Sequence, residues 1–407
     1  MGSVKKIANH FKQYTMVAAG ALGLTGGRAP YGPLRAQIGI SDPCNHRCVF
    51  CWDHPPDDRE SADTADRFAG ARPGVMSLQQ FEEIVDDLYA MGTRRIDLVG
   101  RGEPLTNRNV LDMIRYAKEH DMQLLMVTNG SRLSERIAQG IVEARVDRIN
   151  LSLNAGTPET YPHIHVTETP ENYLKVKKNL RFLSDYKIAA RSDLPYLSLT
   201  FVINSKNYFE IANMIEVTHE VGAQGADFAH AVLHDGTSDL AMNETQYQAF
   251  HESLPPARER AAALGLRNNL GTLSAWTPPY MPSRMVGPTI VPCYVGWYYT
   301  VVLGNGSVMP CCQCASPVGH LTKERRFADI WASSEYAEFR AAAKSLPEKS
   351  DRLMTCECDN CYLRPRNLAI HNFLHPLNPI QVGGDVQRFT PKDFLRKMRG
   401  RYGEPVG

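Results

Sequence analysis

Short apolar runs alternate with longer amphipathic runs between residues 35 and 265 of the chain. The apolar runs have the length of buried strands, and they predict six strands at residues 35–41, 95–99, 123–128, 148–153, 196–203 and 225–231. The runs between and after them repeat apolar residues at helical spacing, which predicts helices at residues 77–91, 110–120, 134–143, 170–186, 208–221 and 245–264. Ser77 and Gln80 fit a capping box at the first of these helices.

The alternation predicts an α/β fold in which helices cover a parallel sheet. A closed barrel of this kind has eight strand–helix units, and this chain offers only six. We therefore expect an open, partial (β/α)6 TIM-like barrel at residues 35–265.

Other parts of the chain lack this pattern and predict further segments. Residues 1–34 form a helical N-terminal extension, whose apolar residues 16–24 we expect to pack on the next domain, with surface anchoring or export as the alternative. Residues 52–76 form a long acidic loop. A linker at residues 266–290 precedes a small cysteine-rich domain at 291–375, with a hairpin at 298–303 and 307–309 and a helix at 327–343. Residues 376–407 form a basic tail.

The composition of the 407 residues is that of a globular protein, with 43% hydrophobic and 22% charged residues. This composition excludes a disordered tail, a coiled coil and a collagen-like fibre. The 45 basic and 44 acidic side chains nearly cancel, so nothing in the charge favours nucleic acid or an anionic membrane as a partner. Residues 16–24 are too few to span a bilayer, and we expect a cytoplasmic protein.

Ten cysteines form three tight groups, and the long stretch between the first two groups contains none. A disulfide scaffold distributes its bridges through a small secreted domain, whereas this chain is large and its cysteines are clustered. The clustering indicates metal ligation in a reducing compartment.

The first group is Cys44, Cys48 and Cys51, directly after the first predicted strand. Three thiolates on one loop can hold three irons of a [4Fe–4S] cluster and leave the fourth iron open to a small chelating ligand. The alternative is a structural zinc ion with His46 or His54 as its fourth ligand.

This motif, Cys-x3-Cys-x2-Cys with the aromatic Phe50 before its last cysteine, resembles the hallmark of the radical SAM superfamily. The resemblance covers roughly residues 35–240 and extends to Gly100-Arg101-Gly102-Glu103-Pro104 after the second strand, although Arg101 replaces the usual glycine. It implies that Glu103 and the Gly102 backbone bind the amino group of S-adenosylmethionine, and that Phe50 and Pro104 belong to the same cofactor-binding site. It also implies that polar residues ending the third and fourth strands face the methionine carboxylate and the ribose, namely Thr128, Asn129, Ser152 and Asn154. Strand-end capping is the alternative role for Ser152 and Asn154.

In this superfamily the cluster gives one electron to bound S-adenosylmethionine, which cleaves to methionine and a 5′-deoxyadenosyl radical. That radical abstracts an unactivated hydrogen atom from the substrate. The resemblance therefore implies an enzyme in which the cofactor supplies the difficult step, and the protein supplies orientation and exclusion of water.

The later cysteines form the pattern Cys293-x12-Gly306-x4-Cys311, followed by Cys358-x2-Cys361. Four thiolates close a coordination sphere completely, which suits a second cluster or zinc. The pattern resembles the C-terminal extension of SPASM and twitch radical SAM enzymes. Because the run of cysteines typical of a full SPASM domain is absent, the resemblance implies one auxiliary [4Fe–4S] cluster on these four residues.

Cys312, Cys314 and Cys356 remain, together with His230 at the end of the sixth strand. The three cysteines could bind a second auxiliary cluster, donate a hydrogen atom to a substrate radical, or serve as buried or surface thiols. We expect His230 to face the pocket as a candidate substrate-binding residue. These four residues are the catalytic candidates, and no other catalytic residue is predicted.

The first functional hypothesis is oxidation or epimerisation of a hydroxylated small molecule, such as a sugar or cyclitol, with the auxiliary cluster accepting the second electron. An electron donor such as flavodoxin or ferredoxin is then implied. The second hypothesis is modification of a ribosomal peptide or a protein, although the residues before the first strand are too few for an independent recognition domain. The third is a non-catalytic iron–sulfur or zinc scaffold, which the polar strand ends disfavour.

Overall fold

The computed structural model describes residues 22–56, 73–233, 236–273 and 291–348. It further describes residues 15, 17–20, 353, 355–356, 358, 361, 363–375, 377 and 380. Most of the basic tail, most of the long acidic loop and residues 274–290 lie outside the described residues.

One curved sheet runs through the described part of the molecule, in the order β10-β9-β8-β1-β2-β3-β4-β5-β6-β7. All pairs from β8 to β7 are parallel, and β9 and β10 continue the sheet in antiparallel fashion. The six predicted strands are present as β1 (Arg35–Ile38), β2 (Arg95–Leu98), β3 (Gln123–Thr128), β4 (Arg148–Ser152), β5 (Tyr196–Ile203) and β6 (Gly225–His230). The others are β7 (Arg267–Asn268), β8 (Tyr299–Val302), β9 (Ser307–Met309) and β10 (Gly319–His320).

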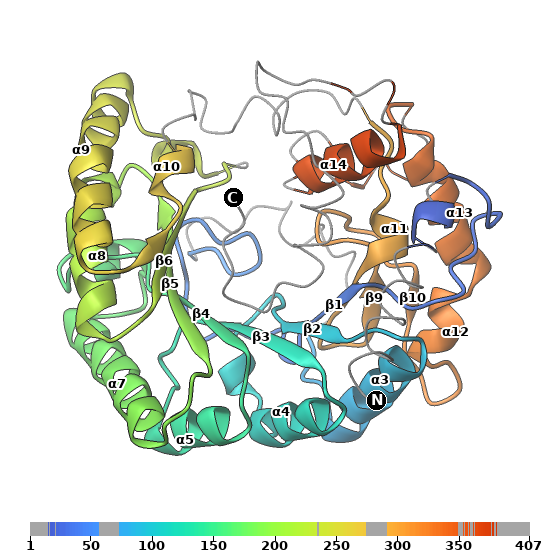
Figure 1. Cartoon of the computed structure of the whole chain (residues 1–407), viewed down its shortest axis with the longest axis horizontal. Coiled ribbons are helices and arrows are strands. Elements are labelled where there is room, and N and C mark those ends of the chain that lie inside the picture. Colours follow the sequence, from blue (N-terminus) through green and yellow to red (C-terminus); the bar gives the residue numbers. More distant parts are fainter. Residues whose placement is uncertain are drawn as a thin grey trace.

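Helices cover the outer face of the sheet, as Figure 1 shows. In the barrel they are α3 (Leu78–Ala90), α4 (Val110–Glu119), α5 (Glu135–Glu143), α7 (Pro170–Ala189), α8 (Ile211–Glu220) and α9 (Glu244–Ala263). Two short helices, α6 (Tyr161–Ile164) and α10 (Leu270–Leu273), follow β4 and β7. Short 3-10 turns lie at η2 (Pro104–Thr106), η3 (Tyr208–Glu210) and η4 (Ser238–Leu240). Ser77 caps α3 by accepting a hydrogen bond from the Gln80 amide, which is the Ser77 half of the predicted capping box. The open partial barrel is therefore confirmed.

Side chains alternate along each strand between the helices and the inner face of the sheet. In β4, Ile149 and Leu151 are fully buried in the core, whereas Arg148, Asn150 and Ser152 lie on the other face and are only half-buried. The inner face is therefore polar at β4, and the apolar core lies between the strands and the helices.

The C-terminal unit continues the barrel sheet and does not form a separate sheet. The predicted hairpin is present as β8 and β9, and β8 pairs in parallel with β1, from Arg35 opposite Tyr299 to Ile38 opposite Val302. The predicted helix at 327–343 is two helices, α12 (Phe327–Trp331) and α13 (Ser334–Lys344), because Ser333 caps a new start by accepting from the Tyr336 amide. Two further helices, α11 (Val295–Tyr298) and α14 (Arg364–Leu374), complete the described unit.

The linker predicted at 266–290 begins too early. Residues 267–273 belong to the barrel, because β7 pairs with β6 and because Leu270 and Leu273 of α10 are fully buried. The described part of the N-terminal extension packs on both units. Gly20 lies against the ring of Trp297 and Gly27 accepts from Arg340 at 3.4 Å, whereas the Gly32 amide donates to Met91 O of the barrel at 2.9 Å. Among the described residues, no helix is both long and apolar enough to cross a membrane.

Candidate radical SAM and auxiliary cluster sites

The loop that carries Cys44, Cys48 and Cys51 follows β1 at the carboxyl edge of the sheet. Its middle part pairs with the segment after α6, because the Val49 amide donates to Ile164 O at 3.0 Å and the Val166 amide donates to Arg47 O at 3.0 Å. This backbone pairing fixes Cys48 beside His165.

The segment after β2 packs directly on the backbone that leads into Cys44. The Glu103 amide donates to Pro43 O at 3.1 Å. A Cβ atom at Gly102 would overlap the carbonyl oxygens of Asp42 and Pro43, so only glycine fits this approach. Steric contact therefore explains why this motif has glycine at position 102. The close packing brings the ends of β1 and β2 together.

The Glu103 carboxylate connects the ends of β2 and β3. It is 3% exposed, and its Oε1 accepts from the Leu105 amide at 2.9 Å and from the Thr128 hydroxyl at 2.6 Å. Its Oε2 accepts from the Asn129 amide at 2.7 Å. Burial raises the pKa of Glu103, while the hydrogen bonds from Asn129, Thr128 and Leu105 act in the opposite direction. A carboxylate has about four acceptor positions, so one position on Oε2 remains for a cationic ligand.

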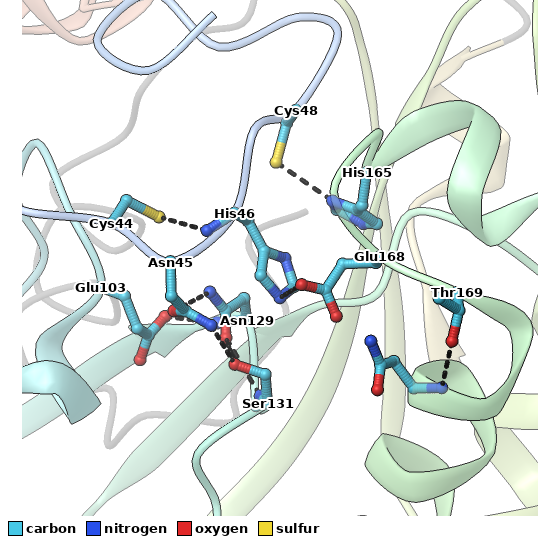
Figure 2. Close-up of polar contacts among 12 residues, drawn as sticks. Cys44, Asn45, His46, Cys48, Glu103, Asn129, Ser131, His165, Glu168 and Thr169 are labelled. Atoms are coloured by element: carbon cyan, nitrogen blue, oxygen red, sulfur yellow. Dashed lines mark hydrogen bonds and ion pairs between the residues drawn. The ribbon is translucent and has the colours of Figure 1, made fainter. Parts of the chain in front are cut away.

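Side-chain amides join the cysteine loop to the segment after β3, as Figure 2 shows. Asn129 Nδ2 donates to Asn45 Oδ1 at 3.1 Å, and Asn45 Nδ2 donates to the Ser131 hydroxyl at 2.8 Å. Asn129 Oδ1 accepts from the Ser131 amide at 3.0 Å. The cysteine loop, Glu103 and the segment after β3 therefore form one hydrogen-bonded unit.

The three thiols lie within electrostatic range of one another, and the three cysteines are half-buried. Burial raises the pKa of Cys48 well above its usual value, and negative charge on Cys51 or Cys44 raises it further. Burial raises the pKa of Cys51 to about 12. Burial also raises the pKa of Cys44, and negative charge on Glu103 adds to this effect. Thiolates in such a place need a compensating cation, and metal binding displaces the thiol protons. The donor set therefore fits an iron–sulfur cluster, since sulfur ligands are what such clusters require.

Two buried histidines lie at this site, His46 within the cysteine loop and His165 beside it (Figure 2). The Cys48 sulfur is 3.1 Å from His165 Nδ1, and His165 Nε2 donates to Leu153 O at 3.1 Å. His46 Nε2 lies 3.4 Å from a carboxylate oxygen of Glu168. The donor atoms of His46, Cys48 and His165 lie within 4.8 Å of one another, so these three residues could also hold a metal ion.

The sequence alternative of zinc with His54 is not supported by the position of that ring. His54 Nε2 donates to Asp42 O at 2.8 Å, and His54 Nδ1 accepts from Arg47 at 3.0 Å. Both ring nitrogens are therefore engaged by the protein. Arg101, the departure from the usual motif, donates to Asp53 at 3.2 Å, so it ties the end of β2 to the residues after Cys51.

Comparison with known proteins gives two family matches. Residues 38–189 match the radical SAM superfamily, and residues 293–362 match SPASM, an iron–sulfur cluster-binding domain. The chain therefore contains a radical SAM domain followed by a SPASM domain. The two domains indicate a [4Fe–4S] cluster that binds S-adenosylmethionine and auxiliary iron–sulfur clusters.

Curated relatives include a probable GTP 3′,8-cyclase of Thermococcus kodakarensis, which is 30% identical over 46% of this chain and 53% of its own length. An AdoMet-dependent heme synthase of Methanosarcina barkeri is 25% identical over 44% of this chain and 45% of its own length. The chain spans about a third to a half of the length of the curated relatives it matches. The crystal structure of Streptococcus suis SuiB bound to precursor peptide SuiA has the same fold, with a TM-score of 0.56, 14% identity, and coverage of 84% of this chain and 74% of SuiB.

The other residues predicted to bind S-adenosylmethionine lie in different structural environments. Phe50 packs against the apolar cluster of Val49, Ile164 and Leu240. Pro104 begins the 3-10 turn after Glu103, and Ser152 is half-buried at the end of β4.

Asn154 has another structural role. It adopts a left-handed conformation with φ 59°, and its Oδ1 accepts from the Val202 amide of β5 at 2.9 Å. The capping role that the sequence left open for this residue is therefore present, and its part in binding S-adenosylmethionine remains a prediction.

The expectation that His230 faces the radical SAM pocket is wrong. Asp227 and Ala229 lie on the half-buried inner face of β6. Because side chains alternate between the two faces of a strand, His230 points to the opposite face, toward α9. There its ring lies edge-on to Phe250, with centroids 5.2 Å apart. His230 is 6% exposed, and burial lowers its pKa to about 4. It is a core residue between β6 and α9.

The second predicted cysteine set surrounds a cavity between the hairpin and α14. All four predicted ligands line it, alongside apolar side chains such as Phe339 and Leu346: Cys293, Cys311, Cys358 and Cys361. Burial, together with nearby thiolates, raises the pKa of Cys293 to about 12 and that of Cys361 to about 11. Asn367 of α14 donates to the Cys293 sulfur at 3.4 Å. The geometry brings the four residues together, and their role as ligands stays a prediction.

The roles considered for Cys314 and Cys356 need correction. The two residues form a disulfide with Cα atoms 4.0 Å apart, so in this state neither carries a thiol that could donate a hydrogen atom or bind iron. The clustering of the ten cysteines suggested metal ligation and gave no reason to pair these two. Cys312 carries no disulfide, and burial together with a thiolate at Cys312 raises the pKa of both Cys311 and Cys361.

Two supporting residues at the radical SAM site were not found from the sequence. The buried Asp42 carboxylate accepts from the Gly74 amide at 2.9 Å and from the Gly304 amide at 3.0 Å. Asn107 donates to both Ile40 O at 2.8 Å and Met76 O at 2.9 Å. In the sequence, only the closeness of these two residues to the cysteine and Gly-Glu-Pro motifs hinted at a supporting role, because most of their hydrogen-bond partners are distant in sequence.

Proposed function

We propose that this protein is an enzyme that reductively cleaves S-adenosylmethionine and uses the resulting 5′-deoxyadenosyl radical to abstract hydrogen from a substrate C–H bond. The observation that carries the proposal is the Glu103 carboxylate. It is buried beside the Cys44 thiol, it is held by donors from the end of β3, and it has one acceptor position left. An ammonium group placed there would bring its ligand to the cysteine loop.

The residues of the chain have distinct parts in this proposal. Cys44, Cys48 and Cys51 hold the cluster, which supplies the electron for cleavage when it is bound. Glu103 binds the amino group of S-adenosylmethionine, and Thr128 and the Asn129 amide keep its carboxylate oriented. A fixed acceptor loses little entropy when the ligand binds, so the sulfonium is positioned with little reorganisation.

The inner face of the sheet favours a polar substrate. Asn150 and Arg148 of β4, Ser198 of β5 and Asp227 of β6 form hydrogen bonds there: Arg148 donates to Asn150 at 2.6 Å and Ser198 donates to Asp227 at 2.6 Å. Such groups recognise hydroxyl and amide groups of a ligand. This face supports oxidation or epimerisation of a hydroxylated small molecule, with reducing equivalents from a donor such as flavodoxin or ferredoxin.

The second candidate is modification of a peptide or protein. It is supported by the SPASM match and by the fold shared with SuiB, whose crystal structure contains a precursor peptide. Both candidates use the same first step, so they differ only in the substrate that stimulates it.

The experiment is iron and zinc analysis of the anaerobically reconstituted protein, with 5′-deoxyadenosine measured on the same sample after reduction. We expect about eight irons per chain and formation of 5′-deoxyadenosine. About twelve irons would indicate a third cluster, and zinc without 5′-deoxyadenosine would contradict the proposal. Cys48→Ala should abolish cleavage, whereas Cys358→Ala should leave it measurable. Adding separated small-molecule and peptide fractions of a cell extract then decides between the two substrate classes by which fraction accelerates cleavage.

A further inference from the structure

The cavity that the second cysteine set surrounds has few polar side chains in its wall besides the cysteines. They are Gln313, Arg364 and Asn367, and the last two belong to α14. Arg364 and Asn367 lie three positions apart and therefore on the same face of the helix. They are only 6% and 4% exposed, so this face is turned into the protein and away from solvent. The first two turns of α14 thus present a buried polar face to the cavity.

The hydrogen bonds of Asn367 fix which end of its side-chain amide faces the nearest cysteine. Its Oδ1 accepts from the Tyr294 amide at 3.0 Å, and its Nδ2 donates to the Cys293 sulfur at 3.4 Å. The reverse orientation would turn the NH2 group toward the Tyr294 amide, so that two donors would face each other. His371, one turn further along α14, lies 2.9 Å from the Tyr294 hydroxyl through its Nδ1. The helix is therefore held at two points beside Cys293, with a donor directed at its sulfur.

This donor suits Cys293 best when its sulfur is a metal ligand. A thiolate that binds iron has no proton and can only accept, whereas a free thiol has a proton of its own to donate. The NH2 group of Asn367 carries two hydrogen atoms, and within the described part of the chain only one of them has an acceptor. The second is available to a group inside the cavity.

Arg364 shows which charge the cavity favours. Its Nη2 donates to Cys358 O at 3.3 Å, and its backbone amide donates to Cys361 O at 3.1 Å. The buried guanidinium is thus tied to the segment that carries two of the predicted ligands. A buried positive charge is stabilised by negative charge nearby, and thiolate ligands of an iron–sulfur cluster supply it. The wall formed by α14 therefore fits an anionic occupant.

We propose that Asn367 is a positioning residue of the auxiliary cluster, which donates a hydrogen bond from Nδ2 to the sulfur of Cys293 when this residue binds iron. The inference rests on the proposed placement of that cluster on Cys293, Cys311, Cys358 and Cys361. The hydrogen bond holds the ligand in place and stabilises the more negative charge of the reduced cluster. Hydrogen bonds to the sulfur atoms are among the factors that set the reduction potential of an iron–sulfur cluster.

The test uses the full chain with the three cysteines of the first group replaced by alanine, so that only auxiliary iron contributes to the signal. Asn367→Leu removes the donor with little change in side-chain volume. The matched control is Asn372→Leu on the same helix, because Asn372 also uses both ends of its amide, here to bond the backbone of Ile380 away from the cavity wall. Each change leaves one backbone amide without its acceptor, so we expect similar losses in the thermal midpoint of the cluster-free protein.

We expect Asn367→Leu to lower the ratio of reduced to oxidised auxiliary cluster about tenfold at a fixed potential, which equals about 59 mV for one electron. We also expect iron release to a chelator to accelerate severalfold. Asn372→Leu should leave both quantities near those of the parent. A purely structural role of Asn367 would lower the thermal midpoint without moving the potential.

A second measurement keeps the native side chain and remains decisive if Asn367→Leu does not fold. The parent is prepared with 15N in the side-chain amides of its asparagines, and pulsed EPR of the reduced cluster measures the coupling to these nitrogens. We expect coupling to one amide nitrogen, which Asn372→Leu retains.

The inference is overturned if this coupling is absent, or if Asn367→Leu changes the ratio and the release rate no more than Asn372→Leu does. A parent that carries about four irons in this background shows that the cluster placement holds even when the inference on Asn367 fails. A parent without iron overturns the placement and the inference together. Formation of 5′-deoxyadenosine by the wild type is a separate result, which concerns the first cysteine group.

Discussion

Glu103 shows how a single side chain can serve both the fold and the proposed reaction. Its carboxylate accepts three hydrogen bonds from the chain, and two of them come from the end of β3. A hydrogen bond from a backbone amide to a carboxylate stabilises the fold more than one to a neutral acceptor, because hydrogen bonds to charged groups are stronger. The same charge is what an ammonium ligand requires, so the fold and the ligand favour the same ionised state.

We predict that Glu103→Gln weakens S-adenosylmethionine binding at least tenfold and destabilises the protein by about 1–3 kcal/mol. The glutamine side chain keeps one acceptor oxygen, but an NH2 group replaces the other. This NH2 group then faces a donor of the chain, either the Asn129 amide or the Thr128 hydroxyl with the Leu105 amide, and that donor loses its acceptor. Equilibrium dialysis with S-adenosylmethionine and urea unfolding measure the two effects. Wild-type affinity in this variant would contradict the proposed role of Glu103.

His230 predicts a pH dependence of stability. Its pKa is about 4 in the folded protein because of burial, against 6.5 for an exposed imidazole. Below pH 6.5 the unfolded chain binds a proton that the folded chain does not, so the free energy of unfolding falls as the pH is lowered from 6.5 toward 4. The contribution is about 2 kcal/mol at pH 5.

We therefore expect His230→Phe to reduce the loss of stability between pH 7 and pH 5 in urea unfolding of the cluster-free protein. The exposed His163→Gln serves as the control and should retain the wild-type slope. A slope in His230→Phe equal to that of the wild type would show that His230 does not contribute.

At the scale of single residues, the motif residues could be predicted from the sequence, but the residues that hold them in place could not. Cys44, Glu103 and Thr128 belong to short local patterns, which a sequence displays directly. Asp42 bonds to Gly74 and Gly304, and such partners are not visible before the chain is folded. The error on His230 has a similar origin: alanines precede and follow it, so the sequence does not fix which face of β6 it occupies.

At the scale of elements, the close approach of the ends of β1 and β2 depends on glycine. We predict that Gly102→Ala costs about 1–3 kcal/mol of stability and lowers iron incorporation, because its Cβ would overlap the carbonyl oxygens of Asp42 and Pro43. Gly271→Ala in α10 is the control, because its Cβ would meet only ordinary contacts with Arg258 at 3.7 Å. Equal thermal midpoints and iron contents of the two variants would show that the approach tolerates a methyl group.

The regular elements could be predicted because their periodicity is strong. The strands at 123–128 and 196–203 have the predicted bounds, and the other predicted strands end slightly earlier than expected. The elements that were missed are short or depend on tertiary pairing. β7 has two residues, and a run of that length has no periodicity to detect. The break between α12 and α13 was missed because the apolar pattern continues across it, although Ser333 is a residue type that often caps helices.

At the scale of the whole molecule, the sheet joins the two domains at the β1–β8 seam. The Gly39 amide donates to Val302 O at 2.8 Å, and Tyr299 donates to Gln37 across the seam. Asp42 adds the bond from the Gly304 amide. The sequence separated the domains by composition and gave no sign of this pairing, because parallel register between distant strands leaves no local pattern. The loop that carries Cys44 thus starts from a strand that the C-terminal domain completes.

The seam predicts that the barrel does not fold alone. A chain of residues 1–290 lacks β8, so β1 becomes an unpaired edge strand with exposed amide and carbonyl groups, which favours aggregation. It also removes the Gly304 amide from the buried Asp42 carboxylate, which leaves part of a buried charge unpaired beside Cys44. We expect this chain to elute as aggregates in size-exclusion chromatography and to bind no iron after reconstitution. A chain of residues 1–380 keeps β8 and all ten cysteines, and it should remain soluble and incorporate as much iron as the full chain. A monomeric 1–290 chain with about four irons would show instead that the barrel and its cluster site are independent of the seam, and the two domains would then be separable units.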